Sequence, residues 1–506
     1  MSLKKRYDAL LPLRDPFMDR AQEASKYTLP HLMPRDGHSK SSKLPTPYQS
    51  VGARGVSNLA AKLLIALFPP GHPFFKLDVD KFTIDKISED EQARAEFDKA
   101  LSDVEQSVMS HVESSPLRTS AFETLKHLIA TGNGLMYKPP GSKRGDIRFY
   151  DLSKYVVKRD ASGNVLEGVL KESISPSMVS EEVRRACDCE DMNADTKNVD
   201  LYTGFKYEDG KCVVTQEIND KAVPDAKDEY PEDKSPWIVL RMQKVDGEDY
   251  GRGYVEEYLG DLISLEGLTK AIVKGSAAAA KVVFLVNPNG TTKATDLNKA
   301  QSGDFKTGRA DDVTSLGLDK FADFRVAKDT IDMIERRVAQ GFLLNSAVQR
   351  DAERVTAAEV QYMAQELDDA LGGIYSILAQ EFQLPLVRRY MQDLMNQKKL
   401  PELPEELVNP VIVTGMDALG RTADLAKLDT LVGDIFSLSP EIASQYIDLS
   451  NYIKRKGAYL RIDTEGLIRT QQQVDQANQK AQMQQMLQEM GPQMMQGVME
   501  QQKGNK

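Results

Sequence analysis

Residues 253–281 show a helical alternation of apolar and polar positions. Apolar side chains recur there every three or four residues, and no proline interrupts the run before Pro288. The members of this face are Val255, Tyr258, Leu262, Leu265 and Ile272. At about 1.5 Å of rise per residue, a helix over this range would be about 44 Å long.

The pattern changes abruptly after residue 281. The run "VVFLVNPNG" from Val282 is apolar and ends in a turn signal, which predicts a buried strand. Glycines then punctuate the chain up to Phe324, as in a small strand-and-loop module; they are Gly290, Gly303, Gly308 and Gly317. A second, shorter helix is predicted over residues 327–346, and its apolar face comprises Ile331, Ile334, Val338 and Phe342. A small β-rich module is therefore expected between two helices.

A third helix is predicted from Thr356, because Thr356 and Glu359 have the spacing of a capping box. Apolar residues then alternate at four- and three-residue intervals, which is typical of a seam that packs on another helix. The seam comprises Val360, Ala364, Leu367, Leu371, Ile374 and Leu378. Gly372 and Gly373 in its middle allow either close approach of a neighbour or a kink.

The first 252 residues mix helical and strand signals, which indicates an α+β region. Helices are expected over residues 56–68 and 93–112, and a hairpin over residues 155–170 with its turn at 160–164. Residues 180–195 are acidic and nonperiodic, so they predict a solvated loop or a short helix with a loop. The Gln- and Met-rich tail, 471–506, is either a helix stabilised in an oligomer or a disordered tail.

Composition narrows the function classes. The 506 residues carry a net charge of -11, so the chain lacks the basic excess of an autonomous nucleic-acid binder, and any DNA contact is expected to be local or fleeting. Three cysteines are too few for a disulfide framework, which favours a reducing compartment and cytosolic synthesis. Neither the N-terminus nor the apolar run 59–68 is long enough to span a bilayer, so no membrane association is expected.

Motifs for catalysis or cofactor binding do not emerge. The stretch "GHSKSSK" from Gly37 lacks the spacing of a phosphate loop, and the "GNG" at Gly132 and "GRG" at Gly251 lack the third glycine of a dinucleotide fingerprint. Histidines occur without zinc-motif spacing, and His111 and His127 are more typical of a helix surface or a satisfied core position. The sequence therefore predicts no enzyme, no catalytic residue, no metal and no cofactor.

Long blocks of the chain do resemble a known family. They include "YTLPHLMP" from Tyr27, "PYQSVGARGVSNLAAKLLIALFP" from Pro47, "YGRGYVEEYLGDLISLE" from Tyr250, "KAQSGDFKTGR" from Lys299 and "LNSAVQRDAERVTAAEV" from Leu344. These blocks resemble the portal, or head-to-tail connector, proteins of short-tailed bacteriophages that encode their own RNA polymerase. The likeness covers about residues 27–421.

The resemblance implies an α+β portal fold and a ring of twelve subunits at one capsid vertex, assembled in the host bacterial cytoplasm. Double-stranded DNA would pass through the channel without sequence specificity. The implied partners are the terminase large subunit, the tail adaptor, the major capsid and scaffolding proteins and, as a further possibility, internal core proteins. A different virion head-tail adaptor or scaffold-type protein is the alternative.

The same resemblance assigns the segments. The wing corresponds to residues 1–252 and 356–430, the two stem helices to 253–281 and 326–346, and the clip to 282–325. The tunnel loop corresponds to 347–355, and the crown with the Gln/Met-rich tail to 431–506.

Three groups of residues become candidate sites. In the tunnel loop, Arg350, Asp351, Glu353 and Arg354 form either a charged collar that touches DNA phosphates or a set of salt bridges. In the clip, Asp304, Lys306, Arg309 and Asp311 dock the terminase and adaptor or only bridge neighbouring clips. At the junction of wing and stem, the candidate joint comprises Tyr250, Gly251, Arg252, Gly253 and Tyr254.

The joint is the interpretation that remains for the Gly-Arg-Tyr cluster, since one arginine among acids has little affinity for phosphate. Gly251 and Gly253 permit a sharp backbone turn, and Tyr250 and Tyr254 are expected to pack around it. Arg252 is expected to pair with an acid of its own or a neighbouring subunit.

Overall fold

The computed structural model describes residues 2–35, 37, 42–70, 74–79, 91–141, 146–189, 198–279, 283–316, 321–344, 367, 370–400, 408–412, 420–438, 447, 452–453 and 456. The chain divides into two compact units. Unit 1 comprises Met1–Gly71 and His111–Lys399, and unit 2 comprises His72–Ser110 and Leu400–Lys506. Helices and strands both occur, and several strands follow one another directly, which confirms the predicted α+β class.

The largest sheet of unit 1 is antiparallel, with the order β4-β5-β6-β7-β8 and with β9 also paired to β7. Its strands are β4 (Tyr155–Arg159), β5 (Val165–Ile174), β6 (Val199–Glu208), β7 (Lys211–Ile218), β8 (Lys221–Ala222) and β9 (Asp228–Pro231). The predicted hairpin is confirmed by β4 and β5. Its turn is closed by Asp160, whose carboxylate accepts a hydrogen bond from the Asn164 amide at 2.8 Å.

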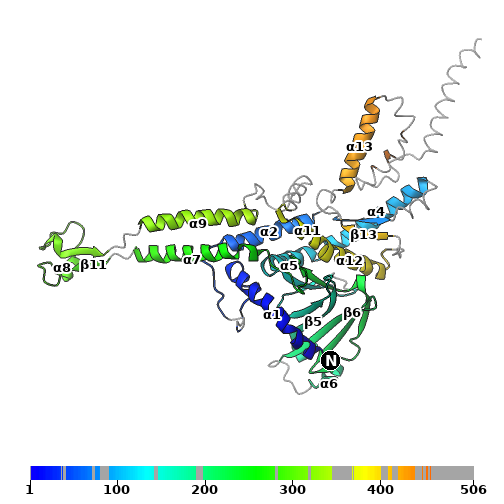
Figure 1. Cartoon of the computed structure of the whole chain (residues 1–506), viewed down its shortest axis with the longest axis horizontal. Coiled ribbons are helices and arrows are strands. Elements are labelled where there is room, and N and C mark those ends of the chain that lie inside the picture. Colours follow the sequence, from blue (N-terminus) through cyan, green and yellow to red (C-terminus); the bar gives the residue numbers. More distant parts are fainter. Residues whose placement is uncertain are drawn as a thin grey trace, which may run out of the picture. The chain divides into compact units, whose positions relative to one another are not determined.

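A second, smaller sheet shares the core of unit 1. Its order is β10-β2-β3, comprising β10 (Trp237–Arg241), β2 (Asn133–Tyr137) and β3 (Arg148–Tyr150). The Trp237 ring stacks on Tyr137, with centroids 4.2 Å apart, and on Phe205 of the larger sheet, at 5.2 Å. Helix α1 (Leu3–Tyr27) lies against β4, β5, β6 and β7 (Figure 1). Aromatic burial thus joins the two sheets into one core.

Further helices complete unit 1. They are α2 (Val51–Leu67), α5 (Leu117–Thr131), α6 (Glu181–Ala186), α11 (Gly373–Leu378), the π-helical turn η4 (Ala379–Gln383) and α12 (Leu384–Asn396), with the short turns η1 (Pro176–Met178) and η2 (Glu232–Lys234). Helix α4 (Glu91–Ser114) begins in unit 2 and ends in unit 1. Of the predicted third-helix seam, Leu367, Leu371, Ile374 and Leu378 are buried. Gly372 has φ +46°, so the predicted kink is confirmed there, whereas Thr356 and Glu359 lie outside the described residues.

The two long helices of the stem pattern form a hairpin in unit 1, α7 (Val255–Ala279) and α9 (Phe321–Gly341), which pack side by side (Figure 1). Between them in sequence lie β11 (Val283–Val286), α8 (Ala294–Asn298), η3 (Ala310–Asp312) and β12 (Val313–Leu316). Strands β11 and β12 form a two-stranded antiparallel ribbon. The predicted order of helix, strand module and helix is therefore confirmed.

Unit 2 contains a second two-stranded ribbon. Strand β1 (Phe75–Val79) pairs antiparallel with β13 (Val408–Ile412), more than 300 residues later in the chain. The Glu105 carboxylate of α4 accepts a hydrogen bond from the Leu77 amide at 2.8 Å. Helix α13 (Gly420–Leu438) follows, and its Asp429 pairs with Lys456 at 2.9 Å.

Two local predictions are corrected by the structure, and a third is confirmed in part. Helix α9 begins at Phe321 rather than at residue 327, because Phe324 packs against Gly275 of α7 and extends the contact by a turn. Strand β11 is not buried: Phe284 is 65% exposed and Leu285 50%, since the described chain places no layer over the ribbon. The acidic stretch after Ser180 does contain a short helix, α6, yet the two cysteines that follow it are buried and pack beside Val199 and Ile218.

In the described part of the chain, no helix combines the length and the hydropathy needed to cross a bilayer.

Candidate assembly and channel site

The α7–α9 hairpin is held by an apolar seam. Leu262 and Leu265 of α7 are buried, as are Ile334 and Val338 of α9, on the faces that the sequence pattern predicts. The Arg337 guanidinium also donates to the Asp261 carboxylate at 2.8 Å. The two helices therefore form one rigid arm rather than two independent segments.

The turn into α7 is fixed by Asn133, the first residue of β2. The Gly251 amide donates to Asn133 Oδ1 at 2.7 Å, and Asn133 Nδ2 donates to the Gly251 carbonyl at 2.8 Å. Gly132 has φ +79°, and a Cβ at this position would lie 2.4 Å from the Arg252 carbonyl carbon. A Cβ on Gly253 would lie 2.7 Å from the Ala130 carbonyl oxygen. Two backbone segments thus approach too closely for side chains, which explains the glycines of the joint.

Tyr250 and Tyr254 anchor the two sides of this turn, as the sequence predicts. Tyr250 is 1% exposed, and its hydroxyl oxygen accepts a hydrogen bond from the Val157 amide of β4 at 2.9 Å. Tyr254 donates to the Gly341 carbonyl at the end of α9 at 2.8 Å, and its ring meets Phe342 edge-on. Burial raises the pKa of both hydroxyls, so both remain protonated at neutral pH. The joint therefore ties β4, α7 and α9 together.

Arg252 pairs within its own chain. Its Nε donates to the Glu248 carboxylate at 3.1 Å, and this hydrogen bond lowers the pKa of Glu248. Of the two partners that the sequence leaves open, the structure shows the intrachain one. A role for Arg252 at a subunit interface stays a prediction.

The far end of α9 is capped by helix α2. Asn58 Nδ2 donates to the carbonyls of Phe342 and Leu343 at 3.1 Å each, and Lys62 Nζ donates to the Leu343 carbonyl at 3.1 Å. Leu343 has φ +53°, a left-handed conformation that ends the helix. The side chains from α2 satisfy carbonyls that a helix end leaves without partners. The point where the chain leaves the stem is therefore fixed.

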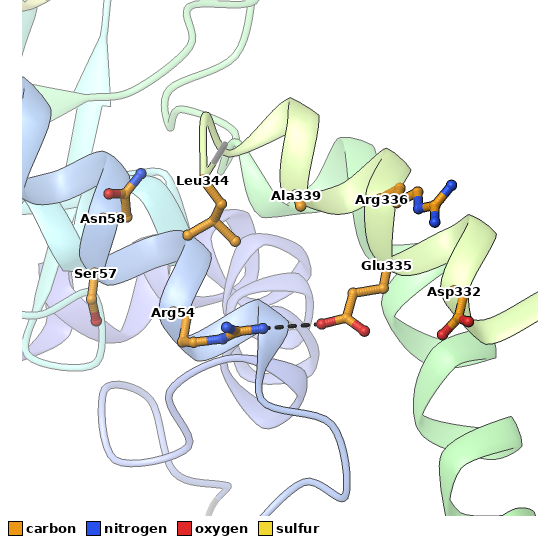
Figure 2. Close-up of a pocket in the computed structure, with 8 residues that line it drawn as sticks. All are labelled: Arg54, Ser57, Asn58, Asp332, Glu335, Arg336, Ala339 and Leu344. Atoms are coloured by element: carbon orange, nitrogen blue, oxygen red, sulfur yellow. Dashed lines mark hydrogen bonds and ion pairs between the residues drawn. The ribbon is translucent and has the colours of Figure 1, made fainter. Parts of the chain in front are cut away.

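A hollow of about 690 Å³ lies between α2 and α9 beside this exit (Figure 2). Arg54 of α2 and Glu335 of α9 form an ion pair across it at 3.0 Å, as the dashed line in Figure 2 marks. Its lining is polar with two apolar members, and comprises Arg54, Ser57, Asn58, Asp332, Glu335, Arg336, Ala339 and Leu344. The mixture of charges and apolar surface is typical of a protein contact rather than of an anion site.

The strand module between α7 and α9, for which the resemblance predicts the role of clip, is organised around Asp312, which is 8% exposed. Its carboxylate accepts hydrogen bonds from the amides of Thr291 and Thr292 at 2.9 and 3.1 Å and from both threonine hydroxyls. Burial opposes ionisation of this carboxyl group, but the hydrogen bonds outweigh burial and lower its pKa. A Cβ on Gly290 would lie 2.5 Å from this carboxyl group, so glycine is required there. The acid that shapes the clip was not among the predicted site residues.

The predicted clip residues are exposed but do not form one cluster. Asp304 lies 3.7 Å from Lys306 and accepts a hydrogen bond from the Gln301 amide. Arg309 and Asp311 lie at the start of η3, where the Arg309 amide donates to the Thr292 hydroxyl. Phe305, between the first pair, is fully exposed. The tunnel-loop candidates Arg350, Asp351, Glu353 and Arg354 lie outside the described residues.

A buried ionic cluster was missed by sequence reasoning. Lys138 and Asp393 form an ion pair that is 1% and 0% exposed, and Arg389 donates to the same carboxylate at 3.0 Å. The Lys138 ammonium also lies 4.4 Å from the centre of the Tyr390 ring. Only the i, i+4 spacing of Arg389 and Asp393 is visible in the sequence, and such pairs are usually exposed. Among the described residues, no group of three or more His, Cys, Asp or Glu side chains is arranged to hold a metal ion.

Comparison with known proteins identifies the family. A family model described as bacteriophage head to tail connecting protein matches residues 1–468. The portal protein of Escherichia phage T7 is 43% identical over 488 residues, which cover 95% of this chain and 91% of that protein. The portal protein of Enterobacteria phage T3 is 44% identical over 476 residues, covering 93% and 88%, and that of Enterobacteria phage SP6 is 32% identical over 431 residues, covering 84% and 81%. The resemblance inferred from the sequence blocks is thereby confirmed: the chain belongs to the bacteriophage head to tail connecting protein family.

Proposed function

We propose that this chain is a portal subunit, twelve copies of which form a ring at one vertex of a phage capsid. The ring serves as the conduit for double-stranded DNA during packaging and ejection. It docks the terminase motor and afterwards the tail adaptor. The role is structural rather than catalytic.

The observation that carries this proposal is the 43% identity, over 95% of the chain, to the portal protein of phage T7. The geometry agrees with it. A rigid two-helix arm is fixed at its base by the joint and carries the clip between its helices in sequence. Such an arm can line a channel while its clip stays accessible to partners.

The charge of the chain supports a conduit rather than a clamp. A net charge of -11 per copy disfavours lasting contact with phosphates, because tight DNA binding requires many lysine and arginine contacts and resists sliding. We assign the transient contact to the tunnel loop, with Arg350 and Arg354 as a collar and Asp351 and Glu353 limiting its affinity. Reversing the charge of both Arg350 and Arg354 should lower the retention of packaged DNA. Unchanged packaging and retention would show that the two arginines do not form a DNA-contacting collar.

Docking is assigned to the exposed clip. Asp304 and Lys306 place one charge of each sign next to the exposed Phe305 in the sequence, and Arg309 and Asp311 add exposed charges at η3. An aromatic side chain surrounded by polar groups is a common anchor in protein interfaces. Phe305→Ala should therefore weaken binding of the terminase or adaptor without changing the fold of the clip.

A genetic experiment tests the proposed function. The gene for this chain is removed from the phage that encodes it, and the chain is supplied from a plasmid in half of the cultures. Capsids made without the chain should contain no nuclease-protected genome, and the plasmid should restore packaging. Filled heads that lack only tails would instead indicate an adaptor added after packaging, and would contradict the portal assignment.

A further inference from the structure

The helical hairpin has two outer edges of exposed residues, one on each helix. On the α7 side Lys270 lies 5.9 Å from the centre of the Tyr48 ring, and on the α9 side Asp332 and Arg336 line the hollow beside α2. On α7, exposed residues follow a 4-3-4 spacing, which defines the α7 edge: Ile263, Gly267, Lys270 and Lys274. On α9, exposed residues follow the same spacing, which defines the α9 edge: Arg325, Asp329, Asp332 and Arg336. A 4-3-4 spacing places the residues of each set on one side of their helix, and each edge lies outside the apolar seam that joins α7 to α9.

Glycines along α7 also indicate a close neighbour. Gly260 and Gly267 are exposed within the helix, and a Cβ on either would meet no atom within 4 Å. Glycine inside a helix costs about 0.5–1 kcal/mol relative to alanine, and nothing within one copy compensates for it. Their seven-residue separation places both on the same side of α7. Close approach of another helix would account for both positions.

Contacts within the hairpin fix its antiparallel register, and with it the height of each α7 residue relative to α9 along the hairpin axis. Gly275 lies against Phe324, Asp261 pairs with Arg337, and Tyr258 lies against Gly341. By the same antiparallel register, Lys270 is level with Asp329. Ile263 is level with Arg336, and Gly267 with Asp332.

Rotation about a ring axis preserves height along that axis. Where the hairpins run along the channel, the α7 edge of one copy therefore meets the α9 edge of the next copy at equal heights. The match is complementary in the middle of the edges, where Lys270 faces Asp329 and Gly267 leaves room beside Asp332. At one end Lys274 is level with Arg325, two like charges, so the attraction comes from the Lys270 level. Within the described residues, neither Asp329 nor Asp332 has an ion-pair partner in its own chain.

We propose that the α7 edge of one copy packs on the α9 edge of a second copy, with Lys270 pairing with Asp329 and Ile263 covering the hollow beside Arg336. This inference rests on the proposed ring and names the surfaces that close it. The contact is head-to-tail, because different surfaces of identical chains meet, and such contacts generate closed rings when the rotation closes.

The hollow in Figure 2 supports the apolar part of this contact. Asp332, Glu335 and Arg336 line its α9 side, and Ala339 and Leu344 supply apolar surface between the charges. Ile263 is 42% exposed and is level with Arg336. In the ring, Ile263 of one copy therefore meets the opening of the hollow in the adjacent copy. An aliphatic side chain surrounded by charged groups matches the usual anatomy of a protein interface, an apolar centre with a polar rim.

A charge exchange tests the pairing. Lys270→Glu and Asp329→Lys are each made alone and then combined, and ring yield is measured by analytical ultracentrifugation and native mass spectrometry. Each single reversal places like charges at every interface of the ring, and should lower the ring fraction about fivefold or more. The double variant restores the opposite-charge pair and should recover most of the yield. Lys5→Glu, on the exposed surface of α1, is the matched control and should leave the yield unchanged.

Circular dichroism of each variant checks that the chain remains folded, which is expected because both side chains are exposed. A wild-type chain that never forms a higher-order species contradicts the ring itself, and with it this pairing. A wild-type ring whose yield survives both single reversals, or a double variant no better than the single ones, contradicts the edge-to-edge pairing alone. Gly267→Leu gives a second readout: it should block the ring while leaving the free chain folded, and normal ring yield would contradict close helix approach.

Discussion

Asn133 and Gly251 are joined by two reciprocal hydrogen bonds, of 2.7 and 2.8 Å, across 118 positions of the chain. The pair fixes the turn that leads from the wing into α7. Asn133→Ala would leave the amide and the carbonyl of Gly251 buried without partners, which should lower the free energy of unfolding by about 2–4 kcal/mol. Urea denaturation followed by circular dichroism measures the change. Asn289→Ala, at an exposed clip position, is the control and should have almost no effect.

A comparison of Gly132 with Gly210 distinguishes the cost of backbone strain at positive φ from the cost of steric crowding by a neighbouring segment. Both have positive φ, of +79° and +73°, but a Cβ would meet the Arg252 backbone only at Gly132. Gly210→Ala should cost about 1 kcal/mol from backbone strain alone. Gly132→Ala should cost at least about 3 kcal/mol, because the joint must open to admit the methyl group. Equal destabilisation of the two variants in urea would show that the close approach at the joint is wrong.

The buried carboxylate of Asp393 is predicted to dominate the stability of the α12 region. Asp393→Asn leaves the buried side chains of Lys138 and Arg389 without a counter-charge. The substitution should lower the free energy of unfolding by about 3–5 kcal/mol. Glu229→Gln removes one partner of an exposed ion pair with Lys211 and should leave the stability almost unchanged. Thermal unfolding of both variants at neutral pH gives the comparison, and similar melting temperatures would contradict the buried cluster.

His127 predicts a loss of stability in mild acid. Burial lowers its pKa from 6.5 to about 4, against the opposing influence of Asp151 and Glu123, and its ring packs on Phe149. Protonation therefore favours the unfolded chain, and stability present above pH 6.5 is lost as the pH falls toward 4. Between pH 7 and pH 5 this one residue should account for about 2 kcal/mol.

The measurement is the difference in urea midpoint between pH 7 and pH 5 for the wild type and for His127→Gln. The substitution keeps a neutral polar side chain at the same place but removes the titration. The variant should show the smaller pH dependence. An identical pH dependence would mean that His127 titrates normally in the folded chain.

Local patterns predicted two helices with a strand module between them because apolar periodicity within one helix is a property of neighbouring residues. The apolar face of Val255, Leu262 and Leu265 can be recognised without knowing what it packs against. The hairpin turn closed by Asp160 and Asn164 can likewise be recognised from its own residues. The joint was predicted from its glycines. Its true partner, Asn133, was not, since a contact across 118 positions leaves no local signal.

Burial was the least predictable property. Phe284 and Leu285 look like a core strand in the sequence, but whether a strand is covered depends on layers that the pattern does not specify. Cys187 and Cys189 are buried within a stretch whose acidic residues predict solvent, because small side chains beside charged ones can still face the sheet. His127 lies in α5, a helix that was not predicted, and of the two positions left open for it, a helix surface or the core, the structure shows a ring packed on Phe149.

The central claim is that identical copies of this chain close into a portal ring, and native mass spectrometry of the purified full-length protein tests it most directly. The account predicts a dominant species near twelve times 56.4 kDa, with an electron-microscopic projection that shows a central channel. A chain that stays monomeric or dimeric across salt and protein concentrations, also in the presence of its capsid and scaffolding partners, would contradict it.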